Sequence, residues 1–276
     1  YQAFHDVTQK TIVNGIVIPA NQTAPQDLKA VLDALFDHQN TGPFICSQLI
    51  QRLVTSNPST GYVYRVAQVF DNDGAGTRGN LAAVVRAILL DYEARSLTEV
   101  NNPGYGKLKE PLLRVTGIFR AFNAASAEGR FPIFDPEVSM DQAALRSPTV
   151  FNFFLPGYVQ PGTLAAAGLL APEFQITTAS TAVSVPNYIY SSVYTPAAPS
   201  ASTVVLDLSS LTASASNPAD MVSTLSQLLC SNEMSVQTQQ LITAELKSLP
   251  SSTPPTALAQ AALYLTATSQ DAAIQR

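Results

Sequence analysis

The chain has 276 residues, of which 46% are hydrophobic and 13% are charged, and its formal net charge is −5. This length suffices for a sizeable core, in one large domain or in two smaller ones. The acidic balance and the lack of any run of Lys or Arg argue against nucleic acid as a partner, because neutralising phosphates requires a basic surface. No run of about 18 or more apolar residues occurs, so we expect no membrane-spanning helix.

Residues 1–128 are predicted to form a helical lobe. Residues 25–36 begin with Pro25, which suits the first turn of a helix. Their apolar side chains follow the spacing of an amphipathic helix, with Leu28, Val31, Leu32, Leu35 and Phe36 on one face. Similar patterns predict helices over 43–54, 61–70, 81–95 (with Asn80 as its N-terminal cap) and 108–122.

Residues 129–216 form a connection rich in Phe, Pro, Ser, Thr and Ala, and helical periodicity returns in 217–276. A helix over 176–194 would be interrupted near Pro186, and 203–208 would form a short strand or an extended tie. We therefore predict an all-α fold, an irregular multi-helix domain with long ordered connections and at most a minor β element. Its C-terminal helices, expected to pack on the same domain, are predicted over 219–230, 236–249 and 256–268.

The most distinctive segment of the connection is 146–158, in which Phe151, Phe153 and Phe154 lie between two prolines. Their spacing fits neither the strand period nor the helix period, so we predict a buried, irregular anchor. We favour a plug in the core, with Asn152 bonded to local backbone, over an apolar groove for a ligand. The reason is that burying one Phe contributes about 2–3 kcal/mol.

Several blocks, taken in order along the whole chain, resemble the bacterial family called domain of unknown function 1800. The resemblance is weakest over 180–216, and Asn80 and Tyr92 stand where that family is expected to have Asp and Pro. The matching blocks are His5-Asp6 with Lys10-Thr11, Asn21-Gln22, 42–44, 48–58, 79–91, 107–111, 147–154, 171–176 and the closing residues 263–276.

The resemblance implies an exported bacterial protein, located in the periplasm, at the cell surface or outside the cell. Members of the family are typically much longer than this chain, so it also implies that the chain is a C-terminal half. The expected partner is then the N-terminal half of the same protein or another exported chain, and a homo-oligomer is a further option. No reaction comes with the resemblance.

His5 and Asp6 are the first catalytic candidates. His5 could act as a general base or a metal ligand that Asp6 orients, and Lys10 is close in sequence. Neighbouring residues point in different directions in an extended chain, however, and His38 is the only other imidazole. A structural hydrogen bond of His5 in a loop is therefore the favoured interpretation. Glu173 is a third candidate, as a carboxylate that a hydrolase could use.

Residues 71–76 resemble the beginning of a calcium-binding loop, in which Asp71 and Asp73 would be ligands. An EF-hand also requires an oxygen ligand at its fifth position and a bidentate Glu at its twelfth. Those positions hold Ala75 and Ala82, so we favour a turn that leads into a helix. No cofactor is predicted, with calcium kept as the alternative.

Arginine side chains on apolar helices could reach acidic residues in a buried network. We expect such a network to tie helices together rather than to bind an anionic ligand. The candidates are Arg52, Arg65, Arg86 and Arg114 with Asp91, Glu110 and Glu173.

Cys46 and Cys230 lie far apart in the sequence, and no spacing motif links them. Two separate buried thiols are favoured over a long-range disulfide.

No complete catalytic constellation is recognisable, since nucleophile-elbow, zinc and P-loop motifs are absent from the sequence. We therefore expect a structural or assembly protein that acts through protein–protein contacts. The alternative is an exported hydrolase or carbohydrate-active enzyme whose site is shared with an N-terminal half. Two carboxyl groups about 5–9 Å apart in a cleft would support that alternative.

Overall fold

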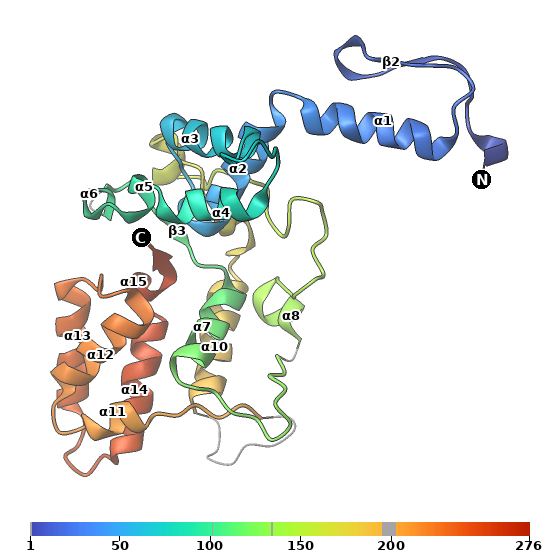
Figure 1. The fold of residues 1–276 in the computed structure, drawn as a ribbon. Coiled ribbons are helices and arrows are strands. Elements are labelled where there is room, and N and C mark those ends of the chain that lie inside the picture. Colours follow the sequence, from blue (N-terminus) through green and yellow to red (C-terminus); the bar gives the residue numbers. More distant parts are fainter. Residues whose placement is uncertain (1, 101, 134, 195–202) are drawn as a thin grey trace. The chain divides into compact units, whose positions relative to one another are not determined.

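The computed structural model describes residues 2–100, 102–133, 135–194 and 203–276. These residues are mostly helical and form two short antiparallel ribbons, so the predicted all-α fold with a minor β element is confirmed (Figure 1). The chain divides into two compact units. Unit 1 comprises Tyr1–Leu53 and Pro58–Ser96, and unit 2 comprises Val54–Asn57 and Leu97–Arg276. The division into 1–128, 129–216 and 217–276 stays a prediction.

Unit 1 begins with a hairpin and continues with helices. Its first long helix starts at a capping box. The Thr23 side chain accepts from the Gln26 N–H, and the Gln26 side chain accepts from the Thr23 N–H. Strands β1 and β2 pair with Lys10 opposite Ile18. The elements are η1 (Gln2–Phe4), β1 (Lys10–Thr11), η2 (Val13–Gly15), β2 (Val17–Ile18), α1 (Ala24–Asp37), α2 (Thr41–Leu53), α3 (Thr60–Asp71), α4 (Leu81–Leu90) and α5 (Tyr92–Arg95).

The core of unit 1 lies among α2, α3 and α4, whose apolar faces meet. Burying these faces is what stabilises helices of this length, because isolated helices of 10–13 residues are marginal in water. The buried residues include Cys46, Ile50, Tyr62, Val66, Phe70, Val84 and Ile88.

The predicted helix over 81–95 is wrong in one respect, because it breaks at Asp91 into α4 and α5. The backbone of Asp91 is extended, and its side chain accepts a hydrogen bond from the Glu93 N–H at 2.9 Å. Asp91 therefore caps a new helix instead of continuing the old one. Asn80 caps α4 as predicted, since its side-chain oxygen accepts from the Ala83 N–H.

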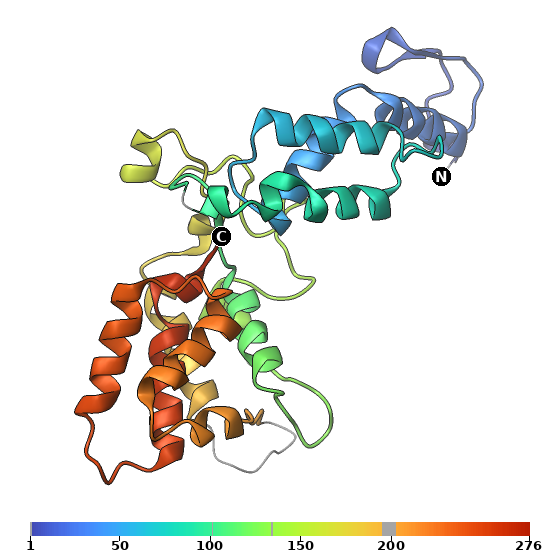
Figure 2. The same cartoon turned by 60° about the vertical axis from the view of Figure 1, so that its left-hand side comes forward.

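Unit 2 contains a second core, made by α7, α8, α10 and the C-terminal helices. The orange and red helices α12, α13 and α14 pack together around it (Figure 2). The elements are α6 (Leu97–Val100), β3 (Lys107–Leu108), α7 (Pro111–Ala121), α8 (Pro136–Met140), α9 (Thr163–Ala166), η3 (Pro172–Ile176), α10 (Thr181–Val193), α11 (Ser209–Ala213), α12 (Pro218–Cys230), α13 (Val236–Ser248), α14 (Pro255–Ala267), α15 (Gln270–Ala273) and β4 (Ile274–Gln275).

Two predicted helices of unit 2 differ in their bounds. The helix expected over 108–122 begins at Pro111, because β3 pairs antiparallel with β4, with Leu108 opposite Ile274. The helix expected over 176–194 begins at Thr181 and continues through Pro186 without an interruption. The extended tie over 203–208 is confirmed at Val205, which exchanges two backbone hydrogen bonds with Ala125.

Only one of the three Phe rings in the Phe-rich segment is buried in the core. Phe154 is buried, Phe151 and Phe153 are half-buried, and the neighbouring Val150 is exposed. Asn152 has φ +76° and turns the chain through its backbone, whose N–H donates to the Thr149 carbonyl. The predicted burial of all three Phe rings is therefore wrong, because this turn directs successive side chains away from a common core.

Candidate functional site: a buried Lys–Glu pair beside a cavity

The most deeply buried ion pair among the described residues joins Lys107 and Glu173 in unit 2. Lys107 comes from β3 and Glu173 from η3, and the Lys107 Nζ lies 3.1 Å from the Glu173 Oε1. Each side chain is only 1% exposed. The second carboxylate oxygen, Oε2, accepts a long hydrogen bond of 3.4 Å from the Ser56 hydroxyl.

The pair is almost completely excluded from solvent, and this exclusion governs its energetics. Taking two charges out of water costs several kcal/mol per ion, and mutual attraction offsets that cost only when the partners stay together. Removing one partner would leave the other charge buried and uncompensated. We therefore treat the pair as a fixed polar centre on which unit 2 depends.

Gly106 positions Lys107 by adopting a backbone conformation that favours glycine. Its φ is +99°, and a Cβ placed on it would lie 2.5 Å from the Gln275 carbonyl oxygen. Its N–H donates to the Thr55 hydroxyl at 3.0 Å, and its carbonyl accepts from the Ser56 N–H at 3.0 Å. The segment Val54–Asn57 is thereby attached to the start of β3.

Asn57 positions the segment that carries Glu173. Its side-chain amide mimics a backbone group, because Nδ2 donates to the Leu170 carbonyl at 2.9 Å and Oδ1 accepts from the Leu170 N–H at 2.8 Å. The next N–H, that of Ala171, donates to the Tyr158 carbonyl at 2.8 Å. These bonds hold the chain at the entrance of η3, where Glu173 follows.

A cavity of about 160 Å³ adjoins the pair. Ser56, Lys107 and Glu173 contribute to its polar wall. Its apolar wall comes from Leu164, Leu169, Leu170, Phe174 and Ile274. An apolar pocket with a few convergent polar groups is the usual form of a small-molecule site, so this is the candidate functional site of the described residues.

His5 lies in unit 1, and the carboxylate that it contacts belongs to Asp27 rather than Asp6. The His5 Nε2 is 2.9 Å from the Asp27 Oδ2, and the Lys10 Nζ is also 2.9 Å from that oxygen. Asp27 stands in the first turn of α1, so the three side chains attach the hairpin to this helix. The hydrogen bond from Lys10 lowers the pKa of Asp27, burial opposes that effect, and the bond from His5 adds to it.

The Asp6 side chain makes its hydrogen bonds with Thr8, two residues along the chain. Its Oδ1 accepts hydrogen bonds from the Thr8 N–H at 2.9 Å and from the Thr8 hydroxyl at 2.8 Å. Those bonds lower the pKa of Asp6, and they are typical of a side chain that stabilises a turn. A catalytic role for His5, Asp6 or Glu173 stays a prediction.

The loop that contains Asp71 and Asp73 is held by its own hydrogen bonds. Asp73 accepts from the Asn80 side chain at 2.8 Å and from the backbone N–H groups of Ala75 and Thr77, and these bonds lower its pKa. Asp71 pairs with Arg78. Within the described ranges, no three His, Cys, Asp or Glu side chains gather where they could hold a metal ion. Calcium binding stays a prediction.

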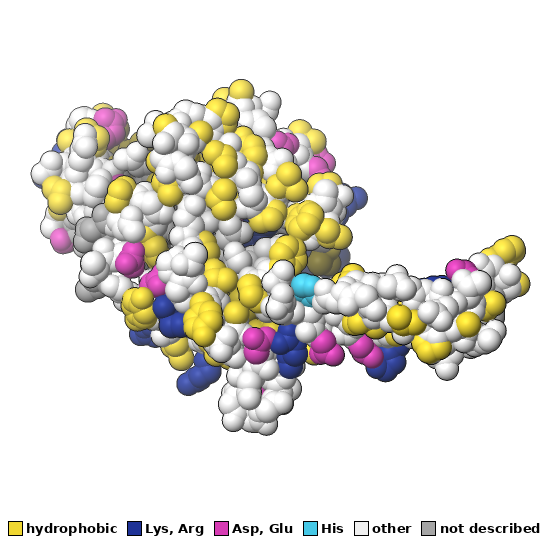
Figure 3. All heavy atoms as spheres, turned by 90° about the horizontal axis from the view of Figure 1, so that it is seen from above, with side chains coloured by type: hydrophobic (Ala, Val, Ile, Leu, Met, Phe, Trp, Pro, Cys, Tyr) yellow, Lys and Arg dark blue, Asp and Glu magenta, His cyan; other side chains and the backbone are white. Residues whose placement is uncertain are grey.

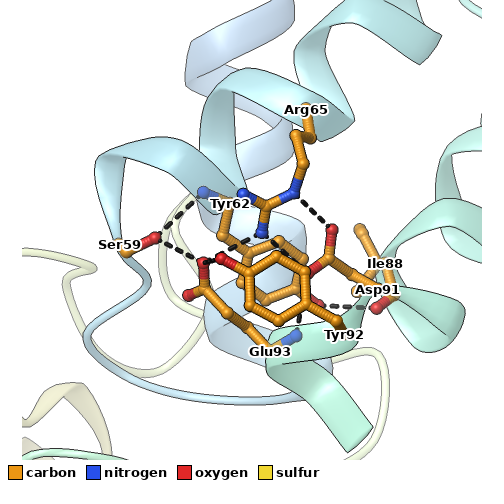
Figure 4. A network of polar contacts seen from close by, with 7 residues as sticks. All are labelled: Ser59, Tyr62, Arg65, Ile88, Asp91, Tyr92 and Glu93. Carbon is orange, nitrogen blue, oxygen red and sulfur yellow. Dashed lines mark hydrogen bonds and ion pairs between the residues drawn. The ribbon is translucent and has the colours of Figure 1, made fainter. Parts of the chain in front are cut away.

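Arg65, a member of the predicted arginine network, meets its acidic partner Asp91 within unit 1 (Figure 4). Its guanidinium donates twice to the Asp91 carboxylate, at 2.8 Å each, and once to Glu93 at 2.9 Å. Burial raises the pKa of Asp91, but the bonds from Arg65 and from the Glu93 N–H lower it further than burial raises it. The network joins α3 to α5 and supports the helix-tying interpretation.

Tyrosines complete this network. The Arg65 guanidinium carbon lies 4.4 Å from the ring centroid of Tyr92, and the Tyr62 hydroxyl donates to the Ile88 carbonyl at 2.6 Å (Figure 4). Ser59 caps α3 and donates a hydrogen bond to Glu93. The Glu93 carboxylate of α5 therefore binds both the N-terminal cap of α3 and Arg65 within α3.

In the described part of unit 2, the expected acidic residues have partners other than arginine. Glu173 pairs with Lys107, and Glu110 accepts a hydrogen bond from Gln142. Arg114 donates to the Ala267 carbonyl at 3.0 Å, so it caps α14. Burial lowers the pKa of Arg114.

Sequence reasoning missed Lys107 as the partner of Glu173, although a signal existed. Ser56, Lys107 and Glu173 each belong to a different block of the family resemblance. The polar and charged side chains of these three blocks could have been considered together as one site. Only the fold shows that they meet.

Fold and site define a mostly helical protein with a buried ion pair beside a small cavity, and the described side chains do not identify a reaction. The chain belongs to the family described as protein of unknown function, DUF1800, whose profile matches residues 1–273. No curated protein and no solved structure matches it. Among the described residues, no helix is both long enough and apolar enough to cross a bilayer.

Proposed function

We propose that this chain is part of an exported structural or assembly protein that acts through protein–protein contacts. The observation that carries the proposal is an exposed apolar face on α1. Leu28, Leu32 and Leu35 are 60%, 56% and 46% exposed, and their spacing puts them on one side of the helix. Figure 3 shows hydrophobic side chains along the segment formed by α1 and the hairpin, at the right of that view.

The face is presented rigidly, because α1 is held at both ends. Asp27 attaches its first turn to the hairpin. At its other end, Arg78 donates to the carbonyls of Phe36 and His38, and Phe36 packs against Phe70. A helix fixed in this way loses little conformational entropy on binding, which favours a docking role.

Covering this face would be favourable. Full burial of one leucine side chain contributes about 1.5–3 kcal/mol, and three leucines stand side by side here. Lys29 and Asp33 pair with each other beside them, so the flank carries both signs of charge. The occupant therefore needs an apolar surface and no strong net charge.

The occupant to which we commit is polypeptide of the same longer protein. The family resemblance is the support for this choice, because it relates the chain to proteins with an additional N-terminal half. A second copy of the chain and a separate exported protein are the other occupants that an experiment would distinguish.

Site-specific photocrosslinking in the producing cells tests the proposal. A benzoylphenylalanine at position 32 is expected to crosslink to peptides of the same gene product from outside these 276 residues. The same group at position 241, where Leu241 is 64% exposed on α13, is the matched control. Crosslinks to another copy of the chain or to another protein would identify that molecule as the occupant instead. A yield at position 32 no greater than at position 241 would overturn the proposal.

An exported hydrolase is the second candidate, and the Glu173 cavity is the observation that favours it. Among its described lining residues, Glu173 is the one carboxylate, so a two-carboxylate mechanism would need its second group from elsewhere. Turnover of glycoside or ester substrates by the purified full-length protein would support this candidate if Glu173→Gln abolished it with folding intact. Turnover that survives this substitution would exclude Glu173 as the catalytic carboxylate.

A further inference from the structure

We propose that the cavity beside Lys107 and Glu173 binds a small neutral molecule with a hydroxyl head and an apolar body of about six carbon atoms. This inference concerns unit 2 alone and does not depend on the docking role of α1. It rests on three properties of the cavity: its unfilled hydrogen-bonding capacity, its charge balance and its size.

The first property is spare acceptor capacity on a buried carboxylate. An ionised carboxylate offers about four lone-pair sites. Glu173 is 1% exposed, yet Oε1 faces Lys107 without an ordinary hydrogen bond, and Oε2 accepts only the long bond from Ser56. Buried polar groups are normally satisfied, and Glu173 lines the cavity, so a donor from a ligand that displaces the side chains over Oε1 would complete this carboxylate.

The second property is the charge balance. Lys107 and Glu173 compensate each other, so a charged ligand would bring an additional uncompensated charge into a buried place. A hydroxyl avoids that penalty, because it can donate to the carboxylate while its own oxygen accepts from an ammonium group. The chemistry of the polar wall therefore selects a neutral hydroxyl over an amine or a carboxylate.

The third property is the size and lining of the cavity. Its volume is about 160 Å³, and cavities of about 150 Å³ lined by aliphatic side chains hold benzene. Leu164, Leu169, Phe174 and Ile274 provide the apolar wall. Pro103 is exposed and Leu169 half-buried, so the lining reaches the surface, where a ligand can enter.

Titrations with three probes of the same ring size test the proposal by NMR of labelled Leu and Ile methyl groups. Phenol is expected to shift the Leu169 and Ile274 resonances saturably and to leave the exposed Leu241 unchanged. Benzene, which lacks the hydroxyl, should bind about tenfold more weakly, because the polar wall then stays unsatisfied. Benzoate should bind at least as weakly as benzene.

Two variants locate the binding. Leu169→Trp fills the cavity from a half-buried position and is expected to abolish the phenol shifts at Ile274 while the helical circular dichroism is retained. Leu241→Trp, at an exposed position of α13 outside the cavity lining, is the matched control and is expected to leave phenol binding unchanged. Equal affinities for phenol and benzene, or phenol shifts that persist in the filled variant, would overturn the proposal. An absence of any saturable shift would overturn it as well.

Discussion

Lys107 and Glu173, which come from a two-residue strand and a short 3-10 helix, form an ion pair of 3.1 Å with both side chains 1% exposed. The pair joins two segments of unit 2 that have little regular structure of their own. Their relative position is therefore determined by charge and hydrogen bonding more than by helix packing.

The first prediction concerns coupling within this pair. Lys107→Met should destabilise unit 2 by about 3–5 kcal/mol, because it leaves the Glu173 carboxylate buried without its cation. The double variant Lys107→Met with Glu173→Gln should be more stable than Lys107→Met alone. Urea unfolding followed by circular dichroism measures both. Additive effects of the two substitutions would mean that the residues do not interact.

The second prediction concerns Gly106. Gly106→Ala should destabilise unit 2, because φ is +99° and the new Cβ would lie 2.5 Å from the Gln275 carbonyl oxygen. Strain and displacement of β4 should together cost on the order of 1–3 kcal/mol. Gly117→Ala is the matched control, since nothing lies within 4 Å of its Cβ position and the residue is inside α7. That control should be neutral or stabilising by up to about 1 kcal/mol.

The third prediction is a pH dependence from Asp91. Its pKa in the folded protein is lowered below the ordinary value of 3.8, so its contribution to stability is fully present above that value. The contribution is lost as the pH falls through the lower, folded pKa. The difference in unfolding free energy between the wild type and Asp91→Asn should therefore be constant from pH 7 to about pH 5 and shrink below about pH 4. Urea unfolding at several pH values measures it; a difference that grows on acidification would contradict the assignment.

The fourth prediction concerns the two cysteines. Both are buried free thiols, and burial raises the pKa of each to about 11, with the nearby Asp71 adding to the effect at Cys46. Since the thiolate is the reactive form, both should be unreactive toward a thiol reagent at pH 8 in the native protein. Both should react within seconds in urea without prior reduction. No reactive thiol in the unfolded and unreduced protein would indicate a disulfide between Cys46 and Cys230 instead.

The helices with a clear apolar face could be predicted from the sequence, because α1, α2, α3 and the C-terminal helices bury or present one side at the helical period. The break at Asp91 could not, since the carboxylate that caps α5 is also held by Arg65 from another helix, and the sequence pattern does not show that contact. The same holds for Lys107, whose segment reads as the beginning of a helix. It becomes a strand only because residues 274–275, at the other end of unit 2, pair with it.

Only part of the candidate site could be predicted from the sequence. Glu173 was identified as a carboxylate of interest, but its expected partners were arginines, which are commoner in helix-tying networks. Its actual partner and the Ser56 hydroxyl lie in loops and a short strand, for which no periodic pattern exists. His5 was expected to make a structural hydrogen bond, and it bonds to Asp27, a residue that sequence neighbourhood could not indicate.

The last prediction separates a docking role of α1 from a role in folding. Leu32 is 56% exposed, so Leu32→Glu should change the unfolding free energy of the isolated chain by less than about 0.5 kcal/mol. Ile50→Glu, at a fully buried position of α2 in the same unit, should unfold unit 1 because it buries a charge without a partner. Where the proposed additional polypeptide covers α1, Leu32→Glu should instead expose the helix, which hydrogen exchange of its backbone amides in the native protein would report. If Leu32→Glu leaves that exchange unchanged while the wild-type face is already exposed, nothing covers the helix and the assembly proposal loses its main support.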